Sequence, residues 1–137
     1  MSGQKDNVNF MQSPATSLPR VLVVDDDQDC ADSLAELLQC LGAETRVVYG
    51  GAQALDELAG FQPRLVLLDI GMPGMDGFEA ARRIRERPEG RDAFLVALTG
   101  WGRAGDRQRG RDAGFDLHMV KPGEIEALKK LLAELPR

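Results

Sequence analysis

The fold is decided by the stretch VLVVDDD, residues 21–27, in which four apolar residues are followed directly by three aspartates. A second stretch of this kind, LVLLD at residues 65–69, leads into the glycine-rich loop GMPGMDG at residues 71–77. Short continuous apolar runs are typical of parallel strands that are buried on both faces. Ligands bind to such sheets at the carboxyl ends of the strands, where these aspartates stand. The two stretches therefore predict a parallel sheet with an acidic binding edge.

Three carboxylates, those of Asp25, Asp26 and Asp69, are expected to meet at this edge. Carboxylates that lie close together repel one another, and a cation among them removes the repulsion. Magnesium prefers hard oxygen ligands of this kind. The sequence thus predicts a Mg²⁺ site and chemistry on phosphoryl groups. We expect Asp27 to cap the following helix instead, since aspartate commonly accepts hydrogen bonds from the first free amides of a helix.

Strand and helix patterns alternate along the rest of the chain. We predict strands at residues 21–24, 44–48, 65–68, 94–98 and 117–120, each followed by a helix. The first four helices end at Gly42, at Gly60, before Pro88 and at Gly114, and the fifth has an apolar stripe that includes Ile125 and Leu135. Five strands alternating with five helices indicate an α/β fold, in which a parallel sheet carries helices on both faces. The polar strand 44–48 is expected at the sheet edge. The fourth helix, about 103–113, has almost no apolar stripe and is expected to be the least firmly held.

The composition is that of one ordinary globular domain. With 137 residues, the chain is long enough to bury a single core. No apolar run approaches the roughly 20 residues that span a bilayer, and no signal peptide is visible, so we expect no membrane contact. Residues 1–19 are polar and lack periodicity, which predicts a disordered leader or linker before a domain at 20–137. Cys30 and Cys40 lack metal-site spacing and are expected to be reduced, partly buried thiols, which favours a cytoplasmic location.

The charge distribution argues against a nucleic-acid partner. Residues 1–70 contain 4 basic and 11 acidic side chains, and residues 71–137 contain 13 basic and 11 acidic ones. A nucleic-acid binder normally presents a dominant basic surface, whereas the arginines of the second half are interleaved with acids. Solvated helix faces explain these arginines, although a protein-docking face remains open.

Two further strands end in groups suited to phosphoryl chemistry. Thr99 follows the fourth predicted strand, and Lys121 follows the fifth. A hydroxyl can bond a phosphoryl oxygen, an ammonium can offset its charge, and a carboxylate such as that of Asp69 can attack phosphorus. Any one of these residues alone would be weak evidence, because helix starts commonly use Asp or Thr. Their occurrence at successive strand ends predicts a phosphoryl-transfer site.

On these residues the chain resembles the response-regulator receiver domains of two-component signalling, from about Arg20 onward. The resemblance rests on the pair Asp25-Asp26, on Asp69 with Met72-Pro73-x-x-Asp76-Gly77, on Ala97-Leu98-Thr99-Gly100, and on Val120-Lys121-Pro122. It implies a flavodoxin-like, doubly wound sheet of five parallel strands in the order 2-1-3-4-5. The segment Leu98-Thr99-Gly100-Trp101-Gly102 resembles the corresponding segment of receivers that are attached to hybrid histidine kinases.

The resemblance also implies separate roles for the acidic residues. Asp69 would accept the phosphoryl group. Asp26, Asp69 and the carbonyl of Gly71 would hold magnesium, and Asp25 would orient a metal-bound water. Thr99 would donate a hydrogen bond to the phosphoryl group, and Lys121 would form an ion pair with it.

The partners implied by the resemblance are a histidine kinase or a phosphotransfer protein, and a downstream protein that the sequence does not identify. Such a domain catalyses its own phosphorylation and dephosphorylation and is not a turnover enzyme. We expect a monomer or a weak homodimer. The phosphorylated lifetime cannot be read from the sequence, nor can the choice between a stand-alone protein and a piece of a hybrid kinase.

Several residues near the predicted site have more than one interpretation. We expect Asp76-Gly77 to start a helix rather than bind metal. Trp101 could be a partner contact or a lid, and the resemblance suggests a cis peptide before Pro122. His118 stands three residues before Lys121, where receivers often have Tyr or Phe. A structural or surface role is favoured for it, whereas a switch role would make the output sensitive to pH.

Three other interpretations compete with the receiver domain. A haloacid-dehalogenase-like phosphatase would use Asp25 and Asp27 as nucleophile and acid, but it needs an acidic pair after the lysine, where only Glu124 and Glu126 follow. A receiver fold used only for docking would require a broken pocket. A flavin-binding domain of similar topology is opposed by the acids after the first strand, because it needs a phosphate-cradling loop there. The chain departs from the receivers at Gly123, where an apolar residue is common, and we expect this glycine to loosen the start of the last helix.

Overall fold

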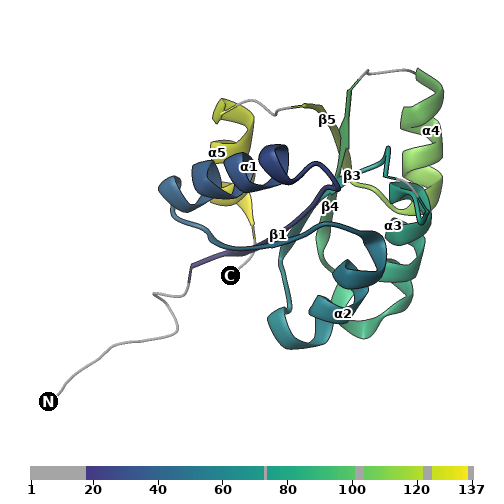
Figure 1. Cartoon of the computed structure of the whole chain (residues 1–137), viewed down its shortest axis with the longest axis horizontal. Coiled ribbons are helices and arrows are strands. Elements are labelled where there is room, and N and C mark those ends of the chain that lie inside the picture. The colour runs from purple at the N-terminus through teal and green to yellow at the C-terminus, as the bar shows by residue number, and fades with distance from the viewer. Residues whose placement is uncertain (1–17, 73, 101–103, 122–124, 136–137) are drawn as a thin grey trace, which may run out of the picture.

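The computed structural model describes residues 18–72, 74–100, 104–121 and 125–135 (Figure 1). Its elements are β1 (Arg20–Val24), α1 (Gln28–Cys40), β2 (Glu44–Val48), α2 (Gly51–Phe61), β3 (Leu65–Asp69), α3 (Gly77–Glu86), the 3-10 turn η2 (Pro88–Gly90), β4 (Phe94–Thr99), α4 (Ala104–Ala113), β5 (Leu117–Val120) and α5 (Ile125–Glu134). The strands pair in parallel in the order β2-β1-β3-β4-β5. This confirms the predicted doubly wound fold, with the polar strand β2 at one edge.

Helices cover both faces of the sheet. In Figure 1, α1 and α5 lie on one side and α2, α3 and α4 on the other. Alternate residues of each strand serve the two layers: Leu22 and Val24 pack with α2 and α3, whereas Val21 and Val23 pack with α1 and α5. All four side chains are fully buried. Burial on both faces is why the central strands are continuous apolar runs.

Two aspartates begin helices, as predicted. The Oδ1 atom of Asp27 accepts a hydrogen bond of 3.2 Å from the amide of Cys30, at the start of α1. The Oδ1 atom of Asp76 accepts one of 2.9 Å from the amide of Glu79, at the start of α3. Each carboxylate satisfies an amide that has no partner within the helix. Gly42 and Gly114 follow α1 and α4 with positive φ angles of 98° and 108°, a conformation in which glycine is unstrained.

Two details of the sequence analysis were wrong. α2 does not end at Gly60 but continues to Phe61, and Gln62 takes the left-handed position with φ 52°. The Phe61 ring is only 3% exposed, so its burial carries the helix past the glycine. Cys30 and Cys40 are exposed rather than partly buried. The buried stripe of α1 consists of Ala31, Leu34, Ala35 and Leu38, which leaves both thiols on the solvent side.

Some predictions fall on residues outside the described ranges. These are the leader at 1–17, Trp101, the peptide before Pro122 and the departure at Gly123. Among the helices in the described ranges, none combines the length and the apolar character needed to cross a membrane.

Candidate functional site

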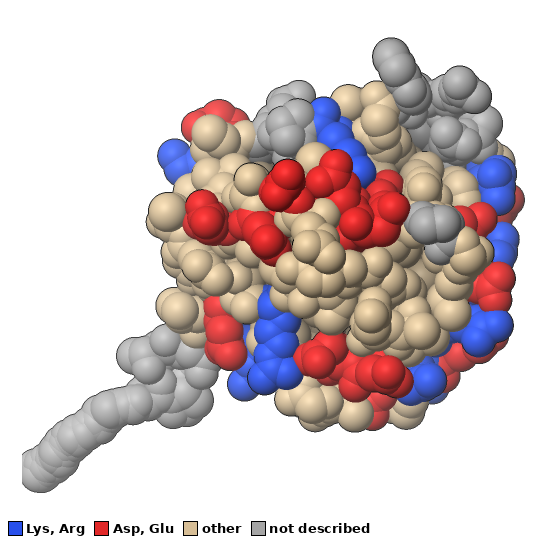
Figure 2. Space-filling view, in the orientation of Figure 1, with Lys and Arg blue, Asp and Glu red and all other residues tan. Residues whose placement is uncertain are grey.

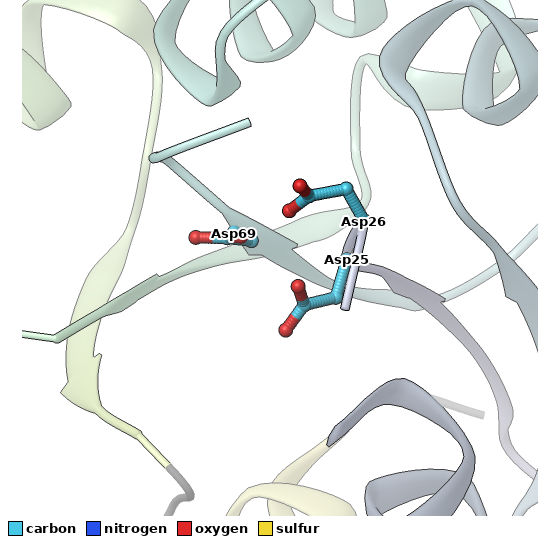
Figure 3. Close-up of side chains that lie close together, drawn as sticks. All are labelled: Asp25, Asp26 and Asp69. Carbon is cyan, nitrogen blue, oxygen red and sulfur yellow. The ribbon is translucent and has the colours of Figure 1, made fainter. Parts of the chain in front are cut away.

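The sheet brings the three predicted carboxylates together. Val24 of β1 lies opposite Leu68 of β3, so Asp25 and Asp69 leave their strands at the same level. Carboxylate oxygens of Asp25, Asp26 and Asp69 lie within 4.8 Å of one another. Figure 3 shows the three side chains side by side, two from the end of β1 and one from β3. Asp25 and Asp69 are 2% and 6% exposed, and Asp26 is open to solvent. Hard oxygen donors in this arrangement could hold a divalent metal.

Lys121, the residue that directly follows β5, joins this cluster. Its Nζ atom lies 2.9 Å from Oδ2 of Asp25 and 3.3 Å from Oδ2 of Asp69. The Lys121 amide donates a 2.8 Å hydrogen bond to the carbonyl of Thr99, which ties the base of the side chain to the neighbouring strand. Within the described residues, this ammonium is the only cation recorded against the three carboxylates. The cluster therefore retains an excess of negative charge.

Burial and neighbouring charges shift the pKa values of Asp25 and Lys121. Burial raises the pKa of the Asp25 carboxyl above its usual range and Asp69 adds to the rise, although hydrogen bonds from Lys121 and the Asp27 amide oppose it. Burial alone would lower the pKa of Lys121, but the Asp25 hydrogen bond and the Asp69 charge outweigh it and raise that pKa. These shifts stabilise the charged form of Lys121, whereas ionisation of Asp25 lowers the stability of the folded protein.

Backbone amides fix one oxygen of each buried carboxylate. Oδ1 of Asp25 accepts a 3.0 Å hydrogen bond from the amide of Asp27, and Oδ1 of Asp69 accepts one of 3.0 Å from the amide of Gly71. The Oδ2 atoms of both residues are left facing Lys121. The predicted role of Gly71 concerned its carbonyl, which no contact in the structure tests.

Thr99 completes the set of strand ends. It is the last residue of β4, is 4% exposed, and its Oγ1 atom has no hydrogen-bond partner among the described residues. A buried hydroxyl without a partner is uncommon because it forfeits the hydrogen bonds that water would make. Such a group is suited to bind an incoming acceptor oxygen.

The surroundings of the cluster are acidic and partly apolar. Figure 2 shows acidic side chains gathered on the upper middle of the face that carries α1 and the strand ends. A groove of about 610 Å³ opens beside the cluster and is lined by Asp25, Asp29, Cys30, Ser33, Leu34, Leu37, Leu98, Lys121 and Ile125. The sequence analysis missed this groove, because the helical spacing of Leu34 and Leu37 predicts only a core stripe.

Comparison with known proteins places these features in a family. The family model described as "response regulator receiver domain" matches residues 21–133. The chain belongs to this family. This receiver domain carries the acidic cluster, Thr99 and Lys121 at the carboxyl ends of the strands of its parallel sheet.

Relatives of this receiver domain differ in length. It is 39% identical over 114 residues to an uncharacterized 14.6 kDa protein of Leptolyngbya boryana, a match that covers 83% of this chain and 87% of that protein. It is 37% identical over 118 residues to the response regulator MprA of Mycobacterium avium, with 86% of this chain and 51% of MprA covered. The chain therefore spans about half the length of MprA.

Solved receiver structures have the same fold. The chemotaxis protein CheY4 of Vibrio cholerae superposes with a TM-score of 0.81 at 27% identity, and the match covers 88% of this chain and 100% of CheY4. The receiver domain of a DNA-binding response regulator of Colwellia psychrerythraea gives a TM-score of 0.77 at 30% identity, covering 85% and 96%.

The raised pKa of Asp25 leads to a prediction about stability and pH. Because the folded-state pKa lies above the unfolded value, the contribution of Asp25 is present below the unfolded pKa and is lost as pH rises through the folded one. Asn cannot lose a proton in this way. Without metal, we expect Asp25→Asn to be more stable than the wild type at neutral pH, with an advantage that shrinks as the pH falls towards about 4.

Urea unfolding at a series of pH values measures this difference. Asp56→Asn, on the exposed side of α2, controls for the loss of a carboxylate elsewhere. An advantage of Asp25→Asn that is constant with pH, or that grows on acidification, would contradict the assignment.

Proposed function

We propose that this receiver domain accepts a phosphoryl group onto Asp69 from the phosphohistidine of a histidine kinase or a phosphotransfer protein. The carrying observation is the position of the Asp69 carboxylate, whose Oδ2 atom lies 3.3 Å from the Lys121 ammonium at the sheet edge. Thr99 ends the neighbouring strand β4, with a buried hydroxyl that lacks a partner in the described residues. We also propose that residues 20–137 form the receiver domain and that 1–19 precede it as a leader or linker.

The residues of the site divide the work of the transfer. The Gly71 amide holds one oxygen of Asp69, and the other oxygen can attack phosphorus. The new O–P bond forms as the P–N bond of the phosphohistidine breaks. The electron pair of the P–N bond stays on the leaving imidazole nitrogen, which takes a proton from water. Lys121 offsets the negative charge that the phosphoryl group brings, and Asp25 holds the lysine in place at 2.9 Å. The Thr99 hydroxyl can then donate a hydrogen bond to a phosphoryl oxygen.

The donor set fits a magnesium ion. Asp25, Asp26 and Asp69 offer carboxylate oxygens within 4.8 Å of one another, and the carbonyl of Gly71 would add a further oxygen. When bound there, Mg²⁺ supplies positive charge that neutralises the reacting phosphoryl group. Asp26 is the exposed member of the set and would serve the metal, whereas Asp25 is also engaged by Lys121.

Phosphorylation would act through a shift between two conformations. The Thr99 hydroxyl, once bonded to the phosphoryl group, favours one position of α4 relative to β4. The surface of α4 would then present a different docking face to a downstream protein. We place this activity in the cytoplasm, in a monomer or a weak homodimer. The acyl phosphate is hydrolysable, so the domain marks itself temporarily and does not turn over a free substrate.

Binding of beryllofluoride, which mimics a phosphoryl group on a carboxylate, tests the proposal. We expect binding only when Mg²⁺ is present, because the acidic cluster otherwise repels the anion. Asp26→Asn is expected to weaken the binding at least about tenfold, and the neighbouring Asp27→Asn, whose amide oxygen can still cap α1, to leave it unchanged. Titration calorimetry measures both.

Two results would count against the proposal. Beryllofluoride binding that does not need a metal would exclude the acidic cluster as a metal site. Steady release of phosphate from many small phosphate esters would favour the haloacid-dehalogenase-like alternative.

A further inference from the structure

The loop after Asp69 is closed by a close approach between its two ends. Gly77, the first residue of α3, donates a 3.4 Å hydrogen bond from its amide to the carbonyl of Ile70. A Cβ atom added to Gly77 would lie 2.6 Å from the carbonyl oxygen of Asp69, so a residue with a side chain does not fit there. The same loop carries Gly71, whose amide holds Oδ1 of Asp69. The position of the loop therefore sets the surroundings of the proposed phosphoacceptor.

Met75 joins this loop to the first turn of α2. Its sulfur atom lies 2.8 Å from the position that a Cβ atom of Gly51 would take, and its Cγ atom lies 3.2 Å from the same point. Gly51 is the first residue of α2 and is buried. The Met75 side chain also packs against the core cluster on the α2 and α3 side of the sheet. The thioether thus fills the space that glycine leaves, and we call this contact of Met75 with Gly51 the Met75 seat.

Met75 differs in exposure from the other methionines of the described residues. Met72 and Met119 are 4% and 7% exposed, whereas Met75 is half-buried. Met1 and Met11 lie outside the described ranges. Oxidants convert a methionine that they can reach to its sulfoxide. Within the described part of the chain, Met75 is therefore the methionine that an oxidant in solution reaches most easily.

A sulfoxide does not fit the Met75 seat. The added oxygen makes an apolar side chain polar and gives it a strong hydrogen-bond acceptor. On the side of α2 the sulfur has no free space, because it already occupies the position of a Gly51 side chain. The Cβ atom of Ala80 lies 3.3 Å from the same position, so an apolar group lines this side of the seat. A polar oxygen without a partner in such surroundings is unfavourable, and the oxidised side chain is expected to leave the seat.

We propose that Met75 is a modification site, at which oxidants of the peroxide class form a sulfoxide that releases the loop after Asp69 from α2. A lone pair of the sulfur forms the S–O bond as the O–O bond of hydrogen peroxide breaks, and the sulfur is oxidised. The second peroxide oxygen leaves as hydroxide, which takes the proton of the transferred hydroxyl group and becomes water. Release of the loop weakens the hold on Asp69 and lowers its phosphorylation. Only this last consequence rests on the proposed function.

Treatment of the whole chain with hydrogen peroxide tests the modification site without any metal or phosphodonor. By peptide mass spectrometry, we expect an added oxygen atom on Met75 before Met72 or Met119 reacts. By urea unfolding, we expect the ratio of folded to unfolded protein to fall about tenfold. Methionine sulfoxide reductases should restore the ratio. Oxidation of Met72 or Met119 at the same rate as Met75, or an unchanged ratio in protein oxidised at Met75, would overturn the proposal.

Met75→Leu is the matched control for the peroxide treatment. Leucine has a similar apolar volume and is a swap that protein cores tolerate, but it has no sulfur to oxidise. The variant retains the exposed thiols of Cys30 and Cys40, so oxidation of these thiols affects both proteins alike. We expect peroxide to leave the stability of Met75→Leu unchanged. A loss as large as that of the wild type would show that another residue is responsible.

The Met75 seat itself is tested by a substitution that needs no oxidant. Gly51→Ala places a methyl group where the sulfur lies, and we expect it to lower the ratio of folded to unfolded protein about tenfold. Gly60→Ala is the control in the same helix, because a Cβ atom added there meets nothing within 4 Å. Alanine favours a helix over glycine, so Gly60→Ala should not destabilise the protein. Equal effects of the two substitutions in urea unfolding would contradict a filled seat at Gly51.

Beryllofluoride binding in the presence of Mg²⁺ connects the modification to the proposed function. We expect the protein oxidised at Met75 to bind about tenfold more weakly than the reduced protein, because the loop that carries Gly71 has lost its contact with α2. Met75→Leu should bind equally well before and after peroxide. If the oxidised and reduced wild type bind equally, the loop does not depend on the Met75 seat and the inference fails. If the reduced protein does not bind at all, the proposed function fails, while mass spectrometry and unfolding still decide the modification site.

Discussion

Replacing Asp69 with Asn is expected to abolish phosphorylation of this receiver domain. The amide has nearly the shape of the carboxylate, and its oxygen can keep the 3.0 Å hydrogen bond from the Gly71 amide. It is not a nucleophile at phosphorus, because its nitrogen lone pair is delocalised into the carbonyl. Lys121 retains its 2.9 Å contact with Asp25, so the pocket is expected to stay folded around the change. We expect no label from a phosphorylated histidine kinase, or from a small phosphodonor with Mg²⁺.

The control for this variant lies at the other end of the same loop. Asp76→Asn also removes a carboxylate but keeps an oxygen that can cap α3, and it should be labelled like the wild type. Urea unfolding of Asp69→Asn checks that the fold is intact. Label that persists on another residue would show that the phosphoacceptor has been assigned to the wrong side chain.

The second large effect is expected from Arg85→Ala, far from the acidic cluster. The Arg85 side chain leaves α3 and donates hydrogen bonds to the carbonyls of Gly90, Arg91, Ala93 and Gly114 and to the carboxylate of Asp116. The same Asp116 oxygen accepts a 2.9 Å hydrogen bond from the amide of Leu95, at the start of β4. One guanidinium thus joins α3 to the segment before β4 and to the turn between α4 and β5. The sequence analysis treated this arginine as part of a solvated helix face, which the contacts contradict.

The loss should amount to about 3 kcal/mol of unfolding free energy. Hydrogen bonds to a charged donor contribute roughly 1.5–3 kcal/mol each, but water can replace part of them because the Arg85 side chain is 23% exposed. The truncation also leaves Asp116 without its cation and several carbonyls without a donor.

Arg83→Ala is the matched control for Arg85→Ala, two residues earlier in the same helix. Arg83 makes an exposed ion pair of 2.6 Å with Glu79, and pairs of this kind contribute under about 1 kcal/mol. Urea unfolding compares the two variants. Similar losses would mean that the Arg85 contacts do not hold these segments together.

The sheet and the acidic cluster could be predicted because their signals are local. A run such as VLVVDD carries both the strand and the carboxylates at its end, and the rule that parallel strands end at one edge places Asp25 near Asp69 without any knowledge of side-chain packing. Helix ends at Gly42 and Gly114 were predicted correctly for a similar reason, since a positive φ is a property of one residue.

The contacts of Arg85, Gly110 and His118 could not be predicted in this way. Arg85 reaches the carbonyl of Gly114, 29 residues along the chain. A Cβ atom added to Gly110 of α4 would lie too close to the His118 ring of β5. This close approach follows from the packing of α4 against β5, whereas in the sequence Gly110 is one glycine in a polar helix. Such contacts depend on the distance between packed elements, which hydrophobic periodicity does not report.

The burial of the Asp25 carboxyl has a consequence for how this chain can change. The position weakens the fold while the carboxyl is ionised, because burial opposes its charge. Neutral substitutions there are among the simplest routes to greater heat resistance, and the same substitutions remove a ligand of the proposed metal site. Selection for thermostability therefore favours a neutral residue at position 25, whereas selection for signalling favours the aspartate. A lineage that retained the fold but no longer needed the phosphoryl group would be expected to lose this aspartate early.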